Sequence, residues 1–295
     1  MSVAAASAPR LDAGRVSWRD ILALLKLRID VLVVCVALAA ALAGGSRSPL
    51  SLSVLVVACL GASAGASCLN HYFDRHLDAR MTRTRRRPLP SGRVTNPRLA
   101  LWLGVALLAL SQASAVTLGP APALYLLAGG LTYAVVYTWW LKPRTAWNIV
   151  IGGAAGSFAA LAGWETAGSA AAPAPILLAV ILLLWTPSHF WSLAIVLERD
   201  YREAGVPMLS AVVGAQRTAD AVLLNTLLLV AASVALAPFV GWVYLLFAVP
   251  AAIGYLACVF RLRRRPDTPH AWRAFKLSGL YLLAILAGLV LTAVV

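Results

Sequence analysis

Three oxygen-bearing side chains recur every four residues where an apolar stretch of the chain meets a strongly basic one. They are Asn70, Asp74 and Asp78. On an α-helix this spacing confines them to an arc of roughly 80°, stacked one turn apart. Placing carboxylates near a bilayer costs free energy unless they bind a cation or another ligand. Because Mg²⁺ binds carboxylates and substrate phosphates together, the three residues predict a magnesium site for a phosphate-bearing ligand.

The residues that follow are rich in arginine. A segment with two prolines and a glycine, 88–92, ends the predicted helix and turns the backbone. Arginines just beyond the carboxylates can then fold back over a diphosphate and bind its oxygens through two parallel hydrogen bonds. We assign Arg83 and Arg87 to this role, whereas we interpret Arg85 and Arg86 as charges that set the orientation in the membrane.

Apolar residues dominate the chain: they form 61% of its 295 positions, whereas 12% are charged and the net charge is +14. A helix needs about 20 apolar residues to cross a bilayer. Nine stretches of about this length are present, at 27–45, 50–69, 99–117, 121–139, 147–164, 174–195, 219–237, 240–260 and 275–294. The sequence therefore predicts an all-α, polytopic membrane protein, a bundle of about nine transmembrane helices with polar cytoplasmic loops.

Basic residues gather on one side of this predicted bundle. If the nine stretches cross in turn, 24 of the 25 lysines and arginines fall on one side, and Arg47 alone falls on the other. Positively charged connections face the cytoplasm. We therefore expect a multi-pass protein of the cell (plasma) membrane whose N-terminus and active site are cytoplasmic. Because the charge alternates with apolar stretches, we do not expect it to bind nucleic acid.

Two connections on this side are long, at 70–98 and 196–218, and both carry acidic and basic side chains. The remaining connections leave little room for a separate soluble domain. We expect a single membrane domain over 1–295, with a cytoplasmic N-terminal segment at 1–26. The two long connections are expected to be its active-site loops.

Four blocks of the sequence are similar to one known family. The pattern Asn-x3-Asp-x3-Asp, followed by Met-x-Arg-Thr-x2-Arg-Pro-Leu, occupies 70–89, and further blocks occupy 137–153, 185–191 and 200–209. Together and in this order they resemble the membrane-intrinsic, UbiA-type prenyltransferases, and among these the protoheme IX farnesyltransferases. The resemblance implies transfer of a farnesyl group from farnesyl diphosphate to a vinyl group of heme B, which gives heme O.

The resemblance also implies roles for individual residues. Asp74 and Asp78 would hold Mg²⁺, and Asn70 would orient them or the diphosphate. Lys142 and Arg144 would bring further positive charge to the diphosphate from the next loop on the same side. The implied partners are heme B, farnesyl diphosphate and the lipid bilayer, with heme A synthase or terminal oxidase assembly as the next step.

One block departs from the wider family, in which many members carry a second aspartate-rich motif after the sixth span. This chain has Asp200 there without the Asp-x3-Asp spacing, as the heme-modifying branch is expected to have, and Asp200 is our candidate catalytic residue for a second set of metal ligands. On the acceptor side the resemblance points to His189, Asn148 and Tyr137. His189 could ligate the heme iron, bind a propionate, act as a base on water, or have only a structural role.

Three other functions are compatible with part of the pattern. A UbiA-type prenyltransferase with another aromatic or chlorin acceptor is the nearest alternative. A CDP-alcohol phosphotransferase also has aspartates and magnesium at the membrane edge, but its motif begins with Asp-Gly, a dipeptide that this sequence lacks. A transporter would place its coupling charges near the midplane, whereas Asp74, Asp78 and Asp200 are predicted at one face.

Overall fold

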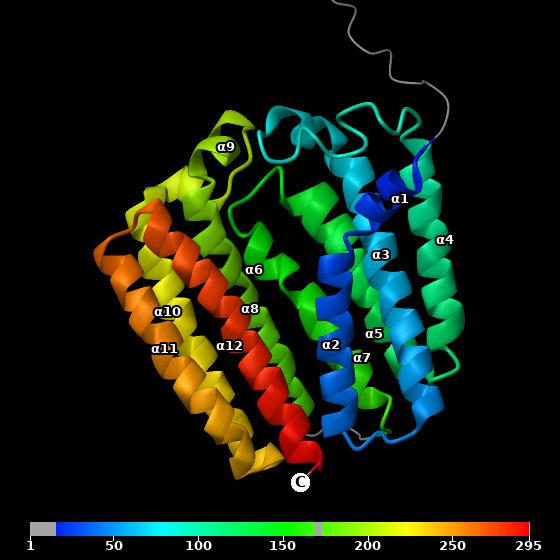
Figure 1. Ribbon diagram of the computed structural model, residues 1–295, viewed down its shortest axis with the longest axis vertical. Coiled ribbons are helices and arrows are strands. Elements are labelled where there is room, and N and C mark those ends of the chain that lie inside the picture. Colours follow the sequence, from blue (N-terminus) through cyan, green and yellow to red (C-terminus); the bar gives the residue numbers. More distant parts are fainter. Residues whose placement is uncertain (1–15, 169–172, 295) are drawn as a thin grey trace, which may run out of the picture.

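The protein is a bundle of helices that run side by side (Figure 1). The computed structural model describes residues 16–168 and 173–294, and every regular element within these ranges is helical. The all-α prediction is therefore confirmed. Residues 1–15 of the predicted N-terminal segment lie outside the described residues.

Most elements follow one another closely, and the one long segment without a helix in the described ranges is 81–97. In chain order they are α1 (Trp18–Leu25), α2 (Leu27–Ala43), α3 (Pro49–Arg80), α4 (Arg98–Ala115), α5 (Pro120–Leu131), the π-helix η1 (Thr132–Leu141), α6 (Asn148–Gly152), α7 (Ala154–Glu165), α8 (Pro173–Val196), α9 (Glu198–Glu203), α10 (Leu209–Val240), the 3-10 helix η2 (Trp242–Tyr244), α11 (Leu245–Arg264) and α12 (Thr268–Val294). In α10, Gly214 has non-helical dihedral angles, so a kink divides that helix near its start.

Seven helices in the described ranges are long and apolar enough to cross a membrane: α3, α4, α5 with η1, α8, α10, η2 with α11, and α12. The predicted number of nine is not confirmed. The stretch predicted at 27–45 is helix α2, whose 17 residues rise about 26 Å, less than a hydrocarbon core of about 30 Å. The stretch at 147–164 is interrupted at Gly153, which leaves the short helices α6 and α7.

Polar segments that are distant in the sequence meet at one end of the bundle. Helix α1, segment 81–97 and helix α9 lie there together, at the top of Figure 1, and the C-terminus lies at the opposite end. The predicted loop 70–98 is partly helical, because α3 continues to Arg80. The predicted loop 196–218 contains α9 and the first turns of α10.

Small residues allow the helices of the first half to approach closely. Because lipid tails are as apolar as the side chains, helix association in a membrane depends on close packing rather than on the hydrophobic effect. A Cβ atom on Gly65 of α3 would lie 2.8 Å from the carbonyl oxygen of Gly104 of α4. A Cβ atom on Gly163 of α7 would lie 2.1 Å from the carbonyl oxygen of Ala37 of α2. Neither pair of helices could pack in this way with larger residues.

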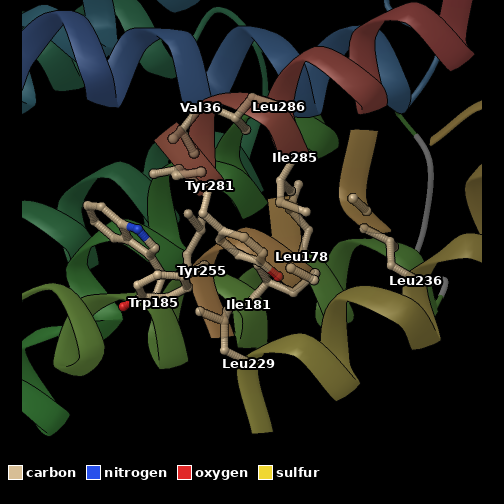
Figure 2. Close-up of a cluster of buried hydrophobic side chains, with 14 of the residues drawn as sticks. Val36, Leu178, Ile181, Trp185, Leu229, Leu236, Tyr255, Tyr281, Ile285 and Leu286 are labelled. Carbon is tan, nitrogen blue, oxygen red and sulfur yellow. The ribbon is translucent and has the colours of Figure 1, made fainter. Parts of the chain in front are cut away.

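Helices α8, α10, α11 and α12 pack around large side chains instead (Figure 2). Tyr255 of α11 and Tyr281 of α12 lie at the centre, with ring centroids 5.5 Å apart. The Tyr281 hydroxyl donates to Ser233 Oγ of α10 at 2.6 Å, so its polar atom is satisfied within the apolar core. Trp185 of α8 lies at the edge of this cluster.

The Gly163 contact provides a test of the packing. We expect Gly163→Val to destabilise the purified protein by about 1–3 kcal/mol, since the side chain would push α7 away from α2. Thermal unfolding in detergent would measure this as a lower Tm. Gly254→Val is the matched control, because a Cβ atom at Gly254 has no neighbour within 4 Å. Equal Tm values for the two variants would contradict the close contact between α7 and α2 at Gly163.

Candidate active site

The three oxygen-bearing residues of the first motif lie on helix α3, as their spacing predicts. Asn70, Asp74 and Asp78 are 3%, 1% and 1% exposed, so the helix presents all three to the interior of the protein. A buried carboxylate is stable only when a cation or hydrogen-bond donors compensate its charge. The neighbours of these residues therefore define the site.

Two cations from different segments pair with the carboxylates. Arg87 Nη1 donates to Asp78 Oδ2 at 2.7 Å, so segment 81–97 folds back over the end of α3. Lys142, directly after the π-helix η1, forms an ion pair with Asp74 Oδ2. Asn70 Nδ2 donates to the same oxygen of Asp74 at 2.8 Å and also to Thr138 Oγ1 at 3.0 Å.

The π-helix brings Lys142 and its neighbours to α3. A π-helix has wider turns than an α-helix and hydrogen bonds that span five residues. The Lys142 N–H accordingly donates to the Tyr137 carbonyl at 2.8 Å. The rings of Tyr133 and Tyr137, four residues apart, are stacked with centroids 5.7 Å apart. The apolar composition of this stretch predicted an ordinary α-helix, and no residue in it indicated the wider turn.

Lys26 is a third cation of the site, and its place in the sequence did not indicate this role. Its ammonium donates to Asn70 Oδ1 and, at 3.2 Å, to the Tyr133 hydroxyl. Burial lowers its pKa from 10.5 to about 7, and the nearby charges of Arg87 and Lys142 act in the same direction. The negative charge of Asp74 acts in the opposite direction, but it offsets the lowering of the Lys26 pKa only partly.

The backbone at Lys26 is unusual. With φ 58° and ψ 49°, Lys26 is the single non-glycine residue in the described ranges that has positive φ. This left-handed conformation costs roughly 1–2 kcal/mol for a residue with a Cβ atom. It separates α1 from α2 and places the side chain toward α3. A dihedral angle of this kind cannot be read from residue types, which is why the sequence did not indicate a site residue.

These polar groups lie at the mouth of a cavity of about 370 Å³. Its charged lining comprises Lys26, Asp74, Asp78, Arg83, Arg87 and Lys142. If all six are ionised, four positive charges face two negative ones, so the mouth favours a polyanion. Deeper in the bundle, apolar residues of α2, α5, α7, α8 and α12 line the cavity, among them Val36, Leu126 and Leu182. The cavity therefore suits a molecule with an anionic head and an apolar tail.

The remaining predicted residues divide into two groups. Tyr137 and His189 line the cavity, and His189 Nδ1 lies 2.7 Å from Ser278 Oγ. Arg144, Asn148 and Asp200 are not among the described residues that line it.

Each residue of the second group has neighbours of its own. The Arg144 guanidinium donates to the carbonyls of Trp139 and Trp140 at 3.0 and 2.7 Å, at the end of η1. Asn148 is fully buried, and its Oδ1 accepts no hydrogen bond from the described residues. Asp200 Oδ2 accepts from the Arg83 N–H at 3.3 Å, which joins α9 to segment 81–97. Their catalytic or binding roles stay predictions.

The donor set at the mouth is compatible with Mg²⁺ that shares its coordination sphere with a substrate. Asp74, Asp78 and Asn70 offer two carboxylates and an amide. Among the described residues, no group of three or more His, Cys, Asp or Glu side chains could by itself enclose a metal ion. Mg²⁺ commonly binds through one or two carboxylates together with substrate phosphates and water. The residues fit this mode of binding and do not form a closed protein cage.

Comparison with known proteins agrees with this arrangement. The UbiA prenyltransferase family matches residues 31–286. Protoheme IX farnesyltransferase 1 of Cenarchaeum symbiosum (strain A) is 42% identical over 284 residues, which cover 93% of this chain and 96% of that protein. The protoheme IX farnesyltransferase of Symbiobacterium thermophilum is also 42% identical, and the match covers 96% of both proteins.

Solved structures share the fold at lower sequence identity. A digeranylgeranylglyceryl phosphate synthase has a TM-score of 0.77 and 17% identity, with 94% of this chain and 98% of that chain covered. A UbiA homolog from Archaeoglobus fulgidus bound to GPP and Mg²⁺ has a TM-score of 0.68 and 20% identity, with 92% and 99% covered. The family match over most of the chain, together with relatives of 42% identity along nearly its full length, shows that this protein belongs to the UbiA prenyltransferase family.

Proposed function

We propose that this protein transfers the farnesyl group of farnesyl diphosphate to a vinyl group of heme B, which gives heme O and diphosphate. The observation that carries the proposal is the juxtaposition of paired carboxylates and surplus cations with an apolar cavity. The relatives named protoheme IX farnesyltransferase support this choice among prenyl transfer reactions.

The reaction requires an allylic carbon–oxygen bond to break, with its electron pair leaving on the diphosphate. The π electrons of the vinyl group then form the new carbon–carbon bond. Water adds to the resulting cation as a hydroxyl group and loses a proton. The barrier falls most when the negative charge that develops on the leaving diphosphate is stabilised.

Residues at the mouth of the cavity are suited to this task. Asp74, Asp78 and Asn70 would hold Mg²⁺, which when bound would neutralise charge on the diphosphate. Arg83, Arg87 and Lys142 would bind its oxygens directly, with Lys26 as a further donor, and we keep Arg144 as a weaker candidate. Once a metal and a diphosphate compete for them, the ion pairs with Asp74 and Asp78 would give way to contacts with the substrate.

The apolar part of the cavity would hold the farnesyl chain. Its walls contain few polar groups, so they would exclude bulk water from the allylic cation before the vinyl group attacks it. Tyr137 and His189 would contact heme B, since both line the same cavity. Asn148 and Asp200 lie next to residues of this wall, and we propose supporting roles for them in acceptor binding and catalysis.

The distribution of charge supports an orientation. We propose that the end of the bundle with α1, segment 81–97 and α9 faces the cytoplasm from the plasma membrane, because positive residues concentrate there. Both substrates would then enter from that side. Heme A synthase or terminal oxidase assembly would consume the product.

A direct experiment tests the function. Expressed in cells that lack heme O, the chain should produce a heme whose mass exceeds that of heme B by one farnesyl group and one hydroxyl group. The purified protein should likewise prefer heme B to hydroxybenzoate-type acceptors. Prenylation of an aromatic acid without prenylation of heme would identify another branch of the same family.

The metal-binding carboxylates provide the first mutational test. We expect Asp74→Asn and Asp78→Asn each to lower the rate of heme O formation by at least about a hundredfold, because the leaving diphosphate would lose its bound cation. Asp220→Asn, at an exposed ion pair with Arg263, should leave the rate unchanged. Near-normal turnover by either test variant, with the Tm unaltered, would contradict the proposed metal site.

Arg87 allows the two substrates to be separated. We expect Arg87→Gln to raise the KM for farnesyl diphosphate by about tenfold to a hundredfold, the effect of one hydrogen bond between charged groups. The KM for heme B should stay constant, and Arg85→Gln, at an exposed position, should change neither constant. A selective rise in the KM for heme would mean that Arg87 binds a propionate.

Lys26 combines a strained backbone with a functional charge, and glycine separates the two. We expect Lys26→Gly to raise the KM for farnesyl diphosphate at least about tenfold, because an ammonium donor is lost. Its Tm should stay equal or rise, because glycine adopts positive φ without strain. Lys26→Met should lose the affinity without the gain in stability, and the exposed Arg28→Met should resemble wild type. Unchanged KM values for both Lys26 variants would exclude Lys26 from the site.

A further inference from the structure

His189 lies in the wall of the cavity, on α8, with its imidazole among aromatic rings. The ring stacks on Trp185 at 4.5 Å between centroids and an angle of 21°. It also contacts Phe275 at 4.3 Å and meets Phe190 edge-on at 5.1 Å. Trp185 belongs to the large cluster of buried residues, which limits its movement (Figure 2). The imidazole is therefore held in one plane by packing.

The hydrogen bonds around His189 determine where its proton lies. The Ser278 hydroxyl donates its single hydrogen to the Phe275 carbonyl at 2.7 Å. Ser278 Oγ can then only accept from His189 Nδ1, which lies 2.7 Å away. The neutral imidazole consequently carries its proton on Nδ1 and an unshared electron pair on Nε2. The contact with Ser278 engages Nδ1 and leaves the electron pair of Nε2 outside it.

Ser278, which holds this proton on Nδ1, is itself held in place by a hydrogen bond to its backbone. Trp185 Nε1 donates to the Ser278 carbonyl at 2.7 Å, so the residue that stacks on the imidazole also anchors the serine. An imidazole that donates from one nitrogen to a rigid acceptor, and presents the other nitrogen to a cavity, has the arrangement of a metal-binding histidine. A propionate would need a donor, and Nε2 of this tautomer cannot donate.

Its depth in the bundle places His189 close to the level of the diphosphate site. His189 lies seven residues before the end of α8, and Asp74 lies six residues before the end of α3. At about 1.5 Å per residue these positions are roughly 10 and 9 Å from the ends of their helices. Both residues thus lie about two turns inside the ends of their helices, and both line the same cavity.

We propose that Nε2 of His189 is an axial ligand of the acceptor's iron, and that Ser278 is the positioning residue that holds the required tautomer. The inference rests on the proposed function, because the iron arrives with the porphyrin substrate. Its consequence is that the iron, as well as the apolar porphyrin ring, orients the vinyl group toward the cavity.

Two probes separate ligation from packing. The full chain in lipid nanodiscs is titrated with ferric heme B and with metal-free protoporphyrin IX, which has the same ring and side chains but no iron. We expect His189→Ala and the more conservative His189→Gln to weaken heme binding by about a hundredfold, with loss of the absorption spectrum of histidine-ligated heme. Binding of metal-free protoporphyrin should change less than about threefold. His76→Ala, at an exposed histidine outside the cavity, is the control.

Ser278 provides a second, independent readout. Removing a hydrogen-bond partner of a metal-binding histidine typically weakens metal affinity about ten- to a hundredfold. We expect Ser278→Ala to weaken heme binding in this range, and Ser278→Thr, which keeps the hydroxyl, to restore it. Neither variant should alter the binding of metal-free protoporphyrin.

Three results would overturn the inference. The first is an equal loss of both porphyrins in the His189 variants, which would make His189 a packing residue. The second is a heme spectrum that is the same in wild type and His189→Gln. The third is unchanged heme affinity with lost turnover, which would make His189 a base on water. In all three cases heme O formation by the wild type would preserve the proposed function, whereas prenyl transfer without heme binding would refute both.

Discussion

Charge compensation at buried carboxylates is the constraint on which the organisation of this protein depends. Asp74 and Asp78 lie on a membrane helix with almost no exposure, and each is paired with a cation from outside that helix. Removing one partner of a buried pair typically costs about 3–5 kcal/mol. The pairs therefore hold segment 81–97 and the end of η1 against α3. In the function that we propose, the same cations would become available when a polyanion enters, so the structural pairs and the binding site would be one arrangement.

Irregular backbone supplies the side chains that regular helices could not place. The π-helix η1 turns Tyr133 and Lys142 toward α3, and the left-handed conformation at Lys26 does the same from the other side. Gly153, where α6 and α7 meet, borders the cavity as well. These departures occur where the helices surround the cavity, which agrees with the general finding that strain and π-turns concentrate at functional sites.

Much of the architecture followed from the sequence, because hydropathy and charge act over whole segments. The all-α fold, the clustering of polar connections at one end and the family were correct, and the helical spacing from Asn70 to Asp78 lies on α3 as expected. The predicted number of nine spans is not confirmed, because α2 is short and the stretch at 147–164 is broken at Gly153. Apolar composition alone does not reveal where a helix stops within an apolar stretch.

The sequence alone determined which residues carry carboxylate, amide and positively charged groups, and it indicated that their segments gather at one end of the bundle. Only the tertiary structure decided which of them meet. It brought Lys26 and Thr138 to Asn70, directed Arg144 to the carbonyls at the end of η1, and set His189 against Ser278. The Arg144 contact is local, whereas the other three join residues that are 44 to 89 positions apart. They depend on dihedral angles and helix packing that no local pattern encodes.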